Sequence, residues 1–134
     1  MRYLLDTNIC IYAIKGHPGV MSKMGEAGFA ACAVSAVVLA ELSYGIARSA
    51  SPYKVRNLSA LREFVGLFDV LPWSAEAAWH HGPLRQQLAA AGTPIGEFDL
   101  LIGAHALAQG LTLVTNNTRE FERIDGLKLE NWAA

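Results

Sequence analysis

The sequence predicts a single α/β domain over residues 1–134, with a mostly parallel central sheet flanked by helices on both faces. Two observations support this prediction. Short apolar runs typical of buried strands alternate with longer segments in which apolar residues recur at helical spacing. The chain has 134 residues and is 52% hydrophobic, which suffices for one core without stabilising disulfides.

Two strand–helix pairs open the chain. Residues 3–5 form a short apolar strand, and the polar run Asp6-Thr7-Asn8 favours a helix N-cap before the apolar residues that follow. Residues 15–18 combine Gly and Pro and stop that helix. Residues 31–34 are typical of a second strand, and Ser35 then caps a second helix.

The middle of the chain predicts a helical hairpin, a strand and a long helix. After a break at residues 49–52, apolar side chains recur at helical spacing through residues 55–65. Residues 67–71 are typical of a third strand, and Ser74 opens a helix that runs towards Gly92. Gly82-Pro83 must kink or break this helix, because proline removes a backbone hydrogen bond.

The last third of the chain predicts two more strands around a polar turn. A loop at residues 92–96 precedes a helix that runs from Asp99 to Gly110. Residues 111–115 are the clearest strand of the sequence. The polar turn at residues 116–118, a short helical segment and a last strand near residues 127–129 follow.

Charge is scarce and locally uneven. Only 17% of the residues are charged and the formal net charge is −1, so no global basic field indicates nucleic acid. Between Leu42 and Arg62, however, there is no acidic residue, whereas Arg48, Lys54 and Arg56 all lie there. This stretch predicts either a surface that contacts phosphates or a simple solvated helix face.

The remaining composition points to an ordinary cytoplasmic protein. No apolar stretch is long enough for a membrane span, and the first residues lack a signal-peptide pattern, so we expect a cytoplasmic location and no membrane contact. Cys10 and Cys32 lie in apolar surroundings without a metal-binding spacing. We expect both to be buried, reduced thiols.

Four carboxylates stand beside hydrophobic runs, at Asp6, Glu41, Asp99 and Glu120. Asp6 and Asn116 follow predicted strands, and parallel sheets gather ligands beyond the carboxyl ends of their strands. Carboxylates brought together repel one another, which a hard divalent cation such as Mg²⁺ or Mn²⁺ relieves. Such an ion would activate a water as the nucleophile for phosphodiester hydrolysis.

Each acid also has a purely structural interpretation. Asp6 and Asp99 could simply cap the helices that follow them, and Glu120 could be a solvated surface acid among charged neighbours. Glu41 is harder to explain in this way, because an unpaired Glu is rare in an apolar helix. A shared site becomes the better hypothesis only when the four acids are considered together.

Three ordered segments, residues 4–15, 35–49 and 93–132, resemble the PIN-domain ribonucleases and among them the VapC toxins of bacterial toxin–antitoxin pairs. The resemblance covers essentially the whole chain and implies a PIN-like fold. It implies that Asp6, Glu41 and Asp99 bind the metal. The supporting polar residues that it implies are Thr7, Asn8, Thr115, Asn116 and Asn117.

The fourth acid departs from the family pattern. Many PIN domains place an Asp in the turn where this chain has Asn116 and Asn117, so Glu120 is the nearest acidic candidate for the catalytic group. Glu97 stands where a small or neutral residue is expected, and no role is assigned to it.

The resemblance also implies an activity and partners. It implies a Mg²⁺-dependent endoribonuclease that cleaves structured RNA and arrests translation, with the anticodon stem-loop of initiator tRNA as the first substrate. It further implies a VapB-type antitoxin that covers the active-site groove, a toxin homodimer within a larger assembly, and operator DNA bound only through the antitoxin. Arg48, Lys54 and Arg56 are then candidates for contacts with the RNA backbone.

Two other hypotheses remain open. The missing Asp in the turn suggests a non-catalytic PIN-like module that holds RNA or a partner without cutting it. A phosphoryl-accepting α/β domain fits poorly, because the haloacid-dehalogenase pattern needs a second Asp where Asn8 stands. Aromatic residues could stack on unpaired bases, although core packing is expected for most of them. These are Tyr44, Tyr53, Trp73, Trp79 and Trp132.

Overall fold

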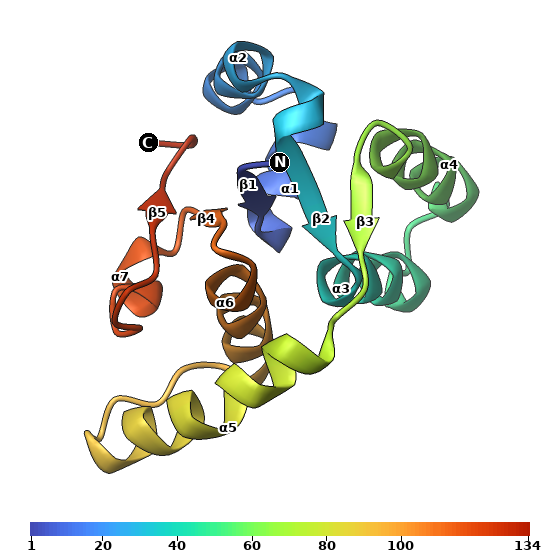
Figure 1. Cartoon of the computed structure of the whole chain (residues 1–134). Helices are drawn as coiled ribbons and strands as arrows, with labels where there is room; N and C mark the ends of the chain where they lie inside the picture. Colours follow the sequence, from blue (N-terminus) through green and yellow to red (C-terminus); the bar gives the residue numbers. More distant parts are fainter.

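The chain folds around one five-stranded sheet in which every neighbouring pair of strands is parallel (Figure 1). The computed structural model describes residues 1–134. The strand order is β3-β2-β1-β4-β5, which confirms the predicted α/β class with its parallel sheet. The strands are β1 (Tyr3–Leu5), β2 (Cys32–Ser35), β3 (Asp69–Leu71), β4 (Thr112–Val114) and β5 (Leu129–Glu130).

Seven α-helices and one short 3₁₀ helix connect the strands (Figure 1). Parallel crossovers are almost always right-handed, so the helices between β1, β2 and β3 cover one face and those leading to β4 and β5 cover the other. The helices are α1 (Thr7–Ile14), α2 (Pro18–Ala27), η1 (Phe29–Ala31), α3 (Ala36–Arg48), α4 (Lys54–Val65), α5 (Ala75–Ala90), α6 (Glu97–Gln109) and α7 (Thr118–Phe121).

The strand order reverses at β1, which lies between β2 and β4. The chain passes from β1 through β2 to β3 at one edge of the sheet. It then returns to the other side of β1, where it forms β4 and β5. In open parallel sheets a crevice forms beyond the carboxyl ends of the strands at such a reversal. The Asp6 backbone N–H donates to the Val114 carbonyl at 2.9 Å, which fixes the ends of β1 and β4 side by side.

The core lies on both sides of the central strands. Leu4, Leu5, Val34 and Leu113 are fully buried, and helix residues such as Ile9 pack against them. The three inner strands β1, β2 and β4 are buried along their whole length, as expected for a sheet covered on both faces.

Helix α2 has no counterpart in the sequence-based prediction, which only identified the stop at residues 15–18. Pro18 occupies its first turn, and the His17 ring Nδ1 accepts the Val20 backbone N–H at 3.2 Å as an N-cap. Burial of Val20 and Met24 holds the helix on the core. Tertiary packing thus stabilises a segment whose two glycines lower its intrinsic helix propensity.

Of the two outcomes predicted at Gly82-Pro83, a kink or a break of the long helix, the break does not occur. Helix α5 continues through Pro83 to Ala90. Its apolar residues Ala77, Leu84 and Leu88 are buried on either side of the proline, and α5 packs along α6. These contacts offset the one backbone hydrogen bond that proline cannot donate.

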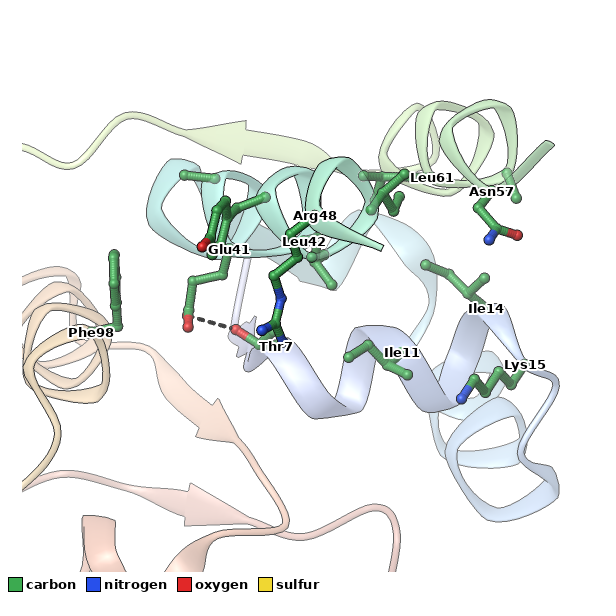
Figure 2. A pocket seen from close by; sticks show the side chains of 15 residues that line it. Thr7, Ile11, Ile14, Lys15, Glu41, Leu42, Arg48, Asn57, Leu61 and Phe98 are labelled. Atoms are coloured by element: carbon green, nitrogen blue, oxygen red, sulfur yellow. Dashed lines mark hydrogen bonds between the residues drawn. The ribbon is translucent and has the colours of Figure 1, made fainter. Parts of the chain in front are cut away.

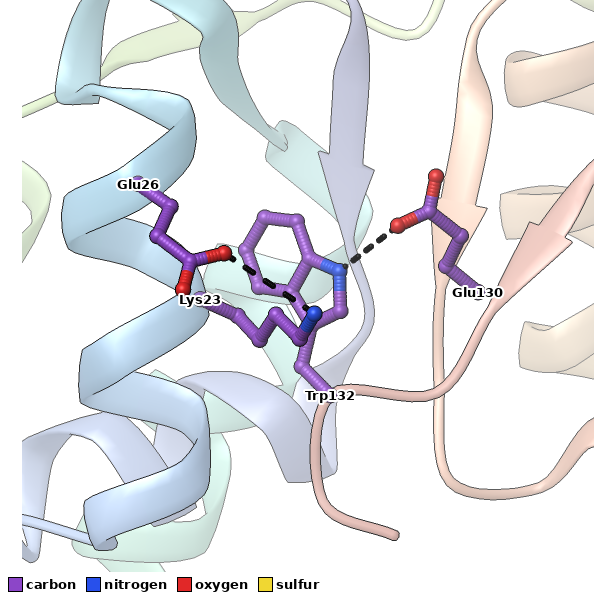
Figure 3. Close-up of polar contacts among 4 residues, drawn as sticks. All are labelled: Lys23, Glu26, Glu130 and Trp132. Atoms are coloured by element: carbon purple, nitrogen blue, oxygen red, sulfur yellow. Dashed lines mark hydrogen bonds and ion pairs between the residues drawn. The ribbon is translucent and has the colours of Figure 1, made fainter.

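The C-terminal segment packs back onto β1 through Trp132. Its ring meets Tyr3 edge-on at 5.1 Å between centroids, and its Nε1–H donates to Glu130 at 3.0 Å (Figure 3). Only 4% of Trp132 is exposed, so this ring belongs to the core. The Lys23–Glu26 ion pair in the same view, at 3.8 Å, is a surface contact within α2.

Both cysteines are buried and free, as predicted. Burial raises the pKa of the Cys32 thiol to about 11 and that of Cys10 further still, so both are protonated at neutral pH. None of the helices combines the length and the apolar character that a bilayer crossing requires.

Candidate active site

Asp6 lies at the carboxyl end of β1 and begins α1. Its Oδ1 accepts the Thr7 backbone N–H at 2.8 Å, and its Oδ2 accepts the Thr115 hydroxyl at 2.7 Å. Only 4% of the residue is exposed. Burial raises the pKa of Asp6, and the two hydrogen bonds oppose that rise by stabilising the carboxylate. Asp6 therefore caps a helix and also presents a buried charge.

Glu41 projects from the middle of α3 towards the start of α1. Its Oε1 accepts the Thr7 hydroxyl at 2.9 Å (Figure 2). Thr7 therefore contacts both acids, Asp6 through its backbone and Glu41 through its side chain. Burial raises the pKa of Glu41, and the charge of Asp6 raises it further.

Asp99 lies in the first turn of α6, half-buried. Burial raises the pKa of Asp99 to about 7, and the charges of Asp6, Glu120 and Glu41 add to that rise in this order. Each of the other three acids thus acts on Asp99 electrostatically. The four acids therefore lie near enough to one another to interact.

Glu120 comes from the short helix α7 and reaches the start of α6. Its Oε1 accepts the Gly96 backbone N–H at 2.8 Å, and its Oε2 accepts the Asn117 side-chain amide at 2.7 Å. Although burial acts to raise the pKa of Glu120, hydrogen bonds from Gly96, Asn117 and Asp99 lower it overall. A Cβ added to Gly96 would lie 3.6 Å from Asp99 Oδ2 and 3.7 Å from Glu120 Oε1. The two carboxylates therefore flank one point at the start of α6.

Three of the five predicted supporting residues contact the acids. They are Thr7, Thr115 and Asn117. The Thr115 hydroxyl also accepts the Asn117 backbone N–H at 3.0 Å, so one turn holds both Asp6 and Glu120 in place. Asn116 instead donates to the Tyr12 hydroxyl at 3.1 Å, and Asn8 is exposed without a side-chain hydrogen bond.

A cavity of about 1010 Å³ opens beside Glu41, between α1, α3, α4 and the start of α6 (Figure 2). Arg48 and Lys15 line it, together with apolar side chains such as Ile11 and Leu61. Of the predicted backbone-contacting residues, only Arg48 lines this cavity. The Lys54 ammonium donates to the Ala47 carbonyl at 2.8 Å, and the Arg56 guanidinium lies 5.5 Å over the Tyr53 ring.

The prediction that most of the candidate aromatic rings belong to the core is wrong for three of them. Tyr44 is 67% exposed, Tyr53 59% and Trp79 82%, whereas Trp132 and in part Trp73 are buried. Tyr44 lies on α3 and Trp79 on α5, and Tyr53 is the N-cap of α4. An apolar ring in a sequence window does not by itself reveal which face of its helix is covered.

A buried polar contact between α3 and α6 was not found from the sequence. His105 Nδ1 lies 2.9 Å from Ser35 Oγ, both residues are fully buried, and His105 Nε2 has no hydrogen-bond partner. Burial lowers the pKa of His105, so the ring is neutral. This contact joins α6 to Ser35, the end of β2 and the N-cap of α3, and so connects the two helices that carry Asp99 and Glu41.

The donor set fits a hard divalent cation. The four acids offer carboxylate oxygens as ligands, which suit Mg²⁺ or Mn²⁺ better than zinc. No three His, Cys, Asp or Glu side chains are arranged so that all could hold one ion together. Glu41 instead accepts from Thr7, and Glu120 accepts from Gly96 and Asn117, so an ion shared by three acids would have to draw the carboxylates closer together.

Comparisons with known proteins agree with this geometry. The PIN domain family matches residues 3–127. The chain is 44% identical over 133 residues to the tRNA(fMet)-specific endonuclease VapC of Shigella flexneri, and 46% identical over 134 residues to ribonuclease VapC2 of Rickettsia felis. The first alignment covers 99% of both chains and the second covers 98% of both.

Solved structures show the same fold. The crystal structure of DNA-bound VapBC from Salmonella typhimurium contains a chain with a TM-score of 0.91 and 40% identity, with 98% of both chains covered. The corresponding chain of VapBC2 from Rickettsia felis, bound to a DNA fragment from its promoter, has a TM-score of 0.89 and 42% identity, with 98% of this chain and 99% of that chain covered. The present chain therefore belongs to the PIN-domain family, and within it to the VapC proteins.

Proposed function

We propose that this chain is the ribonuclease toxin of a VapBC-type toxin–antitoxin pair and that it cleaves RNA with the help of Mg²⁺. The observation that carries this proposal is the convergence of four carboxylates from β1, α3, α6 and α7, with the pKa of Asp99 raised to about 7. A group of acids in this state is costly alone and favourable around a divalent cation. The names of the relatives, ribonuclease and endonuclease, support the same activity.

The chain's own residues position the chemistry. We propose that Asp6, Asp99 and Glu41 hold the ion, with Glu120 as the fourth acid beside Asp99. When bound, a divalent ion supplies the Lewis acidity that activates a water for attack on a phosphodiester. Thr115 and Thr7 orient the carboxylates of Asp6 and Glu41, and the donors at Gly96 and Asn117 keep Glu120 ionised.

The proposed substrate is initiator tRNA, cut in its anticodon stem-loop in the cytoplasm. The support is the name of the Shigella flexneri relative, a tRNA(fMet)-specific endonuclease, at 44% identity over 133 residues. Unpaired loop nucleotides also offer accessible bases and backbone, which suits a site at an open sheet edge.

The proposed partner is a VapB-type antitoxin. The related structures from Salmonella typhimurium and Rickettsia felis are VapBC complexes, each bound to DNA. We infer that the antitoxin of this chain covers the acidic site and that operator DNA is bound through the antitoxin. A toxin homodimer within the larger assembly completes this proposal.

The main argument for the rival hypothesis, a non-catalytic module, is weakened by the position of Glu120. It rested on the missing Asp in the turn at Asn116 and Asn117. Glu120 lies beside Asp99 and accepts a hydrogen bond from the start of α6, which supports its role as the fourth carboxylate.

The proposed function predicts metal-dependent cleavage of tRNA. Purified protein, freed of antitoxin, is incubated with total bacterial RNA in Mg²⁺ or in EDTA, and new 5′ and 3′ ends are mapped by sequencing. We expect new ends in the anticodon loop of initiator tRNA that appear only with Mg²⁺. Absence of metal-dependent ends in any RNA would refute the nuclease proposal, and ends in another RNA would refute the substrate alone.

Replacing Thr115 with Val should weaken Mg²⁺ binding without removing a ligand. The change keeps the side-chain shape but removes the donor to Asp6 Oδ2 and the acceptor for Asn117. Loss of such an outer contact typically costs about 10–100-fold in metal affinity. We expect the Mg²⁺ concentration for half-maximal cleavage to rise by about that factor.

The matched control is Thr112→Val on the same strand. Thr112 is buried, yet its side chain makes no hydrogen bond to the acids. An equal shift in Mg²⁺ requirement for both variants would show that Thr115 acts through general packing and not through Asp6.

A further inference from the structure

One face of α3 carries three chemically different groups in order along the cavity. Glu41, Tyr44 and Arg48 follow one another at spacings of three and four residues and all line the same cavity. The Arg48 guanidinium lies 5.7 Å over the Tyr44 ring. An acid, an aromatic ring and a cation are thus presented along one helix face, with the acid nearest the other carboxylates.

A second exposed ring lies on the α6 side of this cavity. Phe98 directly precedes Asp99, is 52% exposed and lines the cavity with Glu41 and Tyr44 (Figure 2). Leaving two large rings exposed forgoes the free energy of burying them. Since both rings lie within one residue or one helical turn of a carboxylate, the structure places them where the reacting part of a substrate must lie.

The charges that line the cavity favour an anionic occupant. Apart from Glu41 at the acidic end, its ionisable groups are Lys15 and Arg48. Figure 2 shows Lys15 at the far end of α1 from Thr7. No acidic residue occurs between Leu42 and Arg62, the stretch that forms the α3 and α4 walls beyond Glu41. Phosphates can therefore lie along the cavity up to the acids without meeting a like charge.

We propose that this cavity is a nucleobase subsite, in which Tyr44 and Phe98 stack on unpaired RNA bases next to the cleaved phosphodiester and Arg48 and Lys15 contact the flanking phosphates. The proposal rests on the proposed ribonuclease function. Aromatic rings give sequence-tolerant stacking because every base has a π-face. Tyr44 lies three residues, about 4.5 Å along the helix axis, beyond Glu41 and on the same helix face, so a base stacked on its ring lies close to the acids. The subsite selects RNA whose bases are splayed out, as in a loop, over a paired stem.

The test measures binding separately from cleavage. Asp99→Asn is used as a background that does not cut, and its affinity is measured for a fluorescent stem-loop RNA containing the mapped cleavage site. In this background we expect Tyr44→Ala and Phe98→Ala each to weaken binding by about 5- to 100-fold, the range typical of losing one stacked base. Tyr44→Phe should bind like the background, because the ring is kept.

Trp79→Ala is the matched control. Trp79 is the most exposed aromatic ring, at 82%, and lies on α5 outside the cavity. Its loss should leave RNA affinity unchanged. If Tyr44→Ala and Phe98→Ala weaken binding no more than Trp79→Ala does, the subsite is refuted, and the rings then belong to a protein interface.

A base-deletion series tests stacking directly. The same RNA is prepared with one abasic nucleotide at a time on either side of the cleavage site. An abasic position should weaken binding to the Asp99→Asn background but not weaken it further in the Tyr44→Ala or Phe98→Ala variant. Equal losses in background and variants at every position would overturn the proposal. Cleavage of intact RNA by the unchanged chain shows in parallel whether the ribonuclease function itself stands.

Discussion

Replacing Asp99 with Asn should abolish RNA cleavage and at the same time stabilise the metal-free protein. Asn keeps the size of the side chain but cannot neutralise a cation, so we expect the rate of Mg²⁺-dependent cleavage to fall by at least about 100-fold. The pKa of Asp99 is raised from 3.8 to about 7 by burial and by the neighbouring acids. The folded state therefore disfavours the ionised group, and Asn removes that penalty.

The pH dependence of stability follows from the same shift. The unfolded chain ionises Asp99 near its ordinary value of 3.8, whereas the folded chain does so near 7. Between these values the folded state binds the extra proton, so this group's contribution to stability is lost as pH rises through 7. In EDTA, the gain in Tm from Asp99→Asn should be larger at pH 8 than at pH 5, measured by thermal unfolding.

Asp125→Asn is the control for this experiment. It makes the same chemical change at an exposed position, outside the acidic site. We expect its cleavage rate and its Tm at both pH values to match those of the unchanged chain. An Asp99→Asn protein that cuts at the unchanged rate would show that Asp99 is not required.

Replacing Phe121 with Ala should cost about 3–5 kcal/mol of unfolding free energy, as for other buried aromatic side chains. Phe121 is fully buried and ends the four-residue helix α7, which is too short to persist without this anchor. Because α7 also carries Glu120, loosening it should weaken the contact between Glu120 and the start of α6. Urea unfolding measures the first effect and the Mg²⁺ dependence of cleavage the second.

Phe29→Ala is the matched control for the loss of a phenyl ring. Phe29 is 44% exposed and lies in η1, outside the acidic site. We expect a smaller loss of unfolding free energy and no change in the Mg²⁺ requirement. A Phe121→Ala protein as stable as Phe29→Ala would contradict the anchoring role.

The sequence was sufficient to predict the strands and the strand ends at which two of the candidate site residues lie. Apolar runs that end at Asp6 and Thr115 indicated β1 and β4, and both residues lie just beyond the carboxyl ends of these two neighbouring strands. Helix α2 was missed because its stability comes from burying Val20 and Met24, which local propensity does not show. Likewise, Pro83 is accommodated because α5 packs on α6, a contact invisible in a linear pattern.

The site was predictable in its members but not in its internal contacts. Glu120 seemed the least secure acid, since its neighbours in sequence are charged. In space its partners are Gly96 and Asn117, and the first of these lies 24 positions away. The bond between His105 and Ser35 spans 70 positions and gave no local signal. Exposed rings such as Tyr44 could not be told from core rings, because helix periodicity does not state which face is covered.

The 2.7 Å bond between Thr115 and Asp6 joins residues 109 positions apart. During synthesis, β1 and Asp6 therefore leave the ribosome long before β4 and Thr115. The central strand β1 cannot pair with β4 until the last part of the chain has been made. Contacts of such long sequence separation form late in folding. The four acids cannot all meet until synthesis is nearly complete, so under the proposed function the growing chain carries no assembled site.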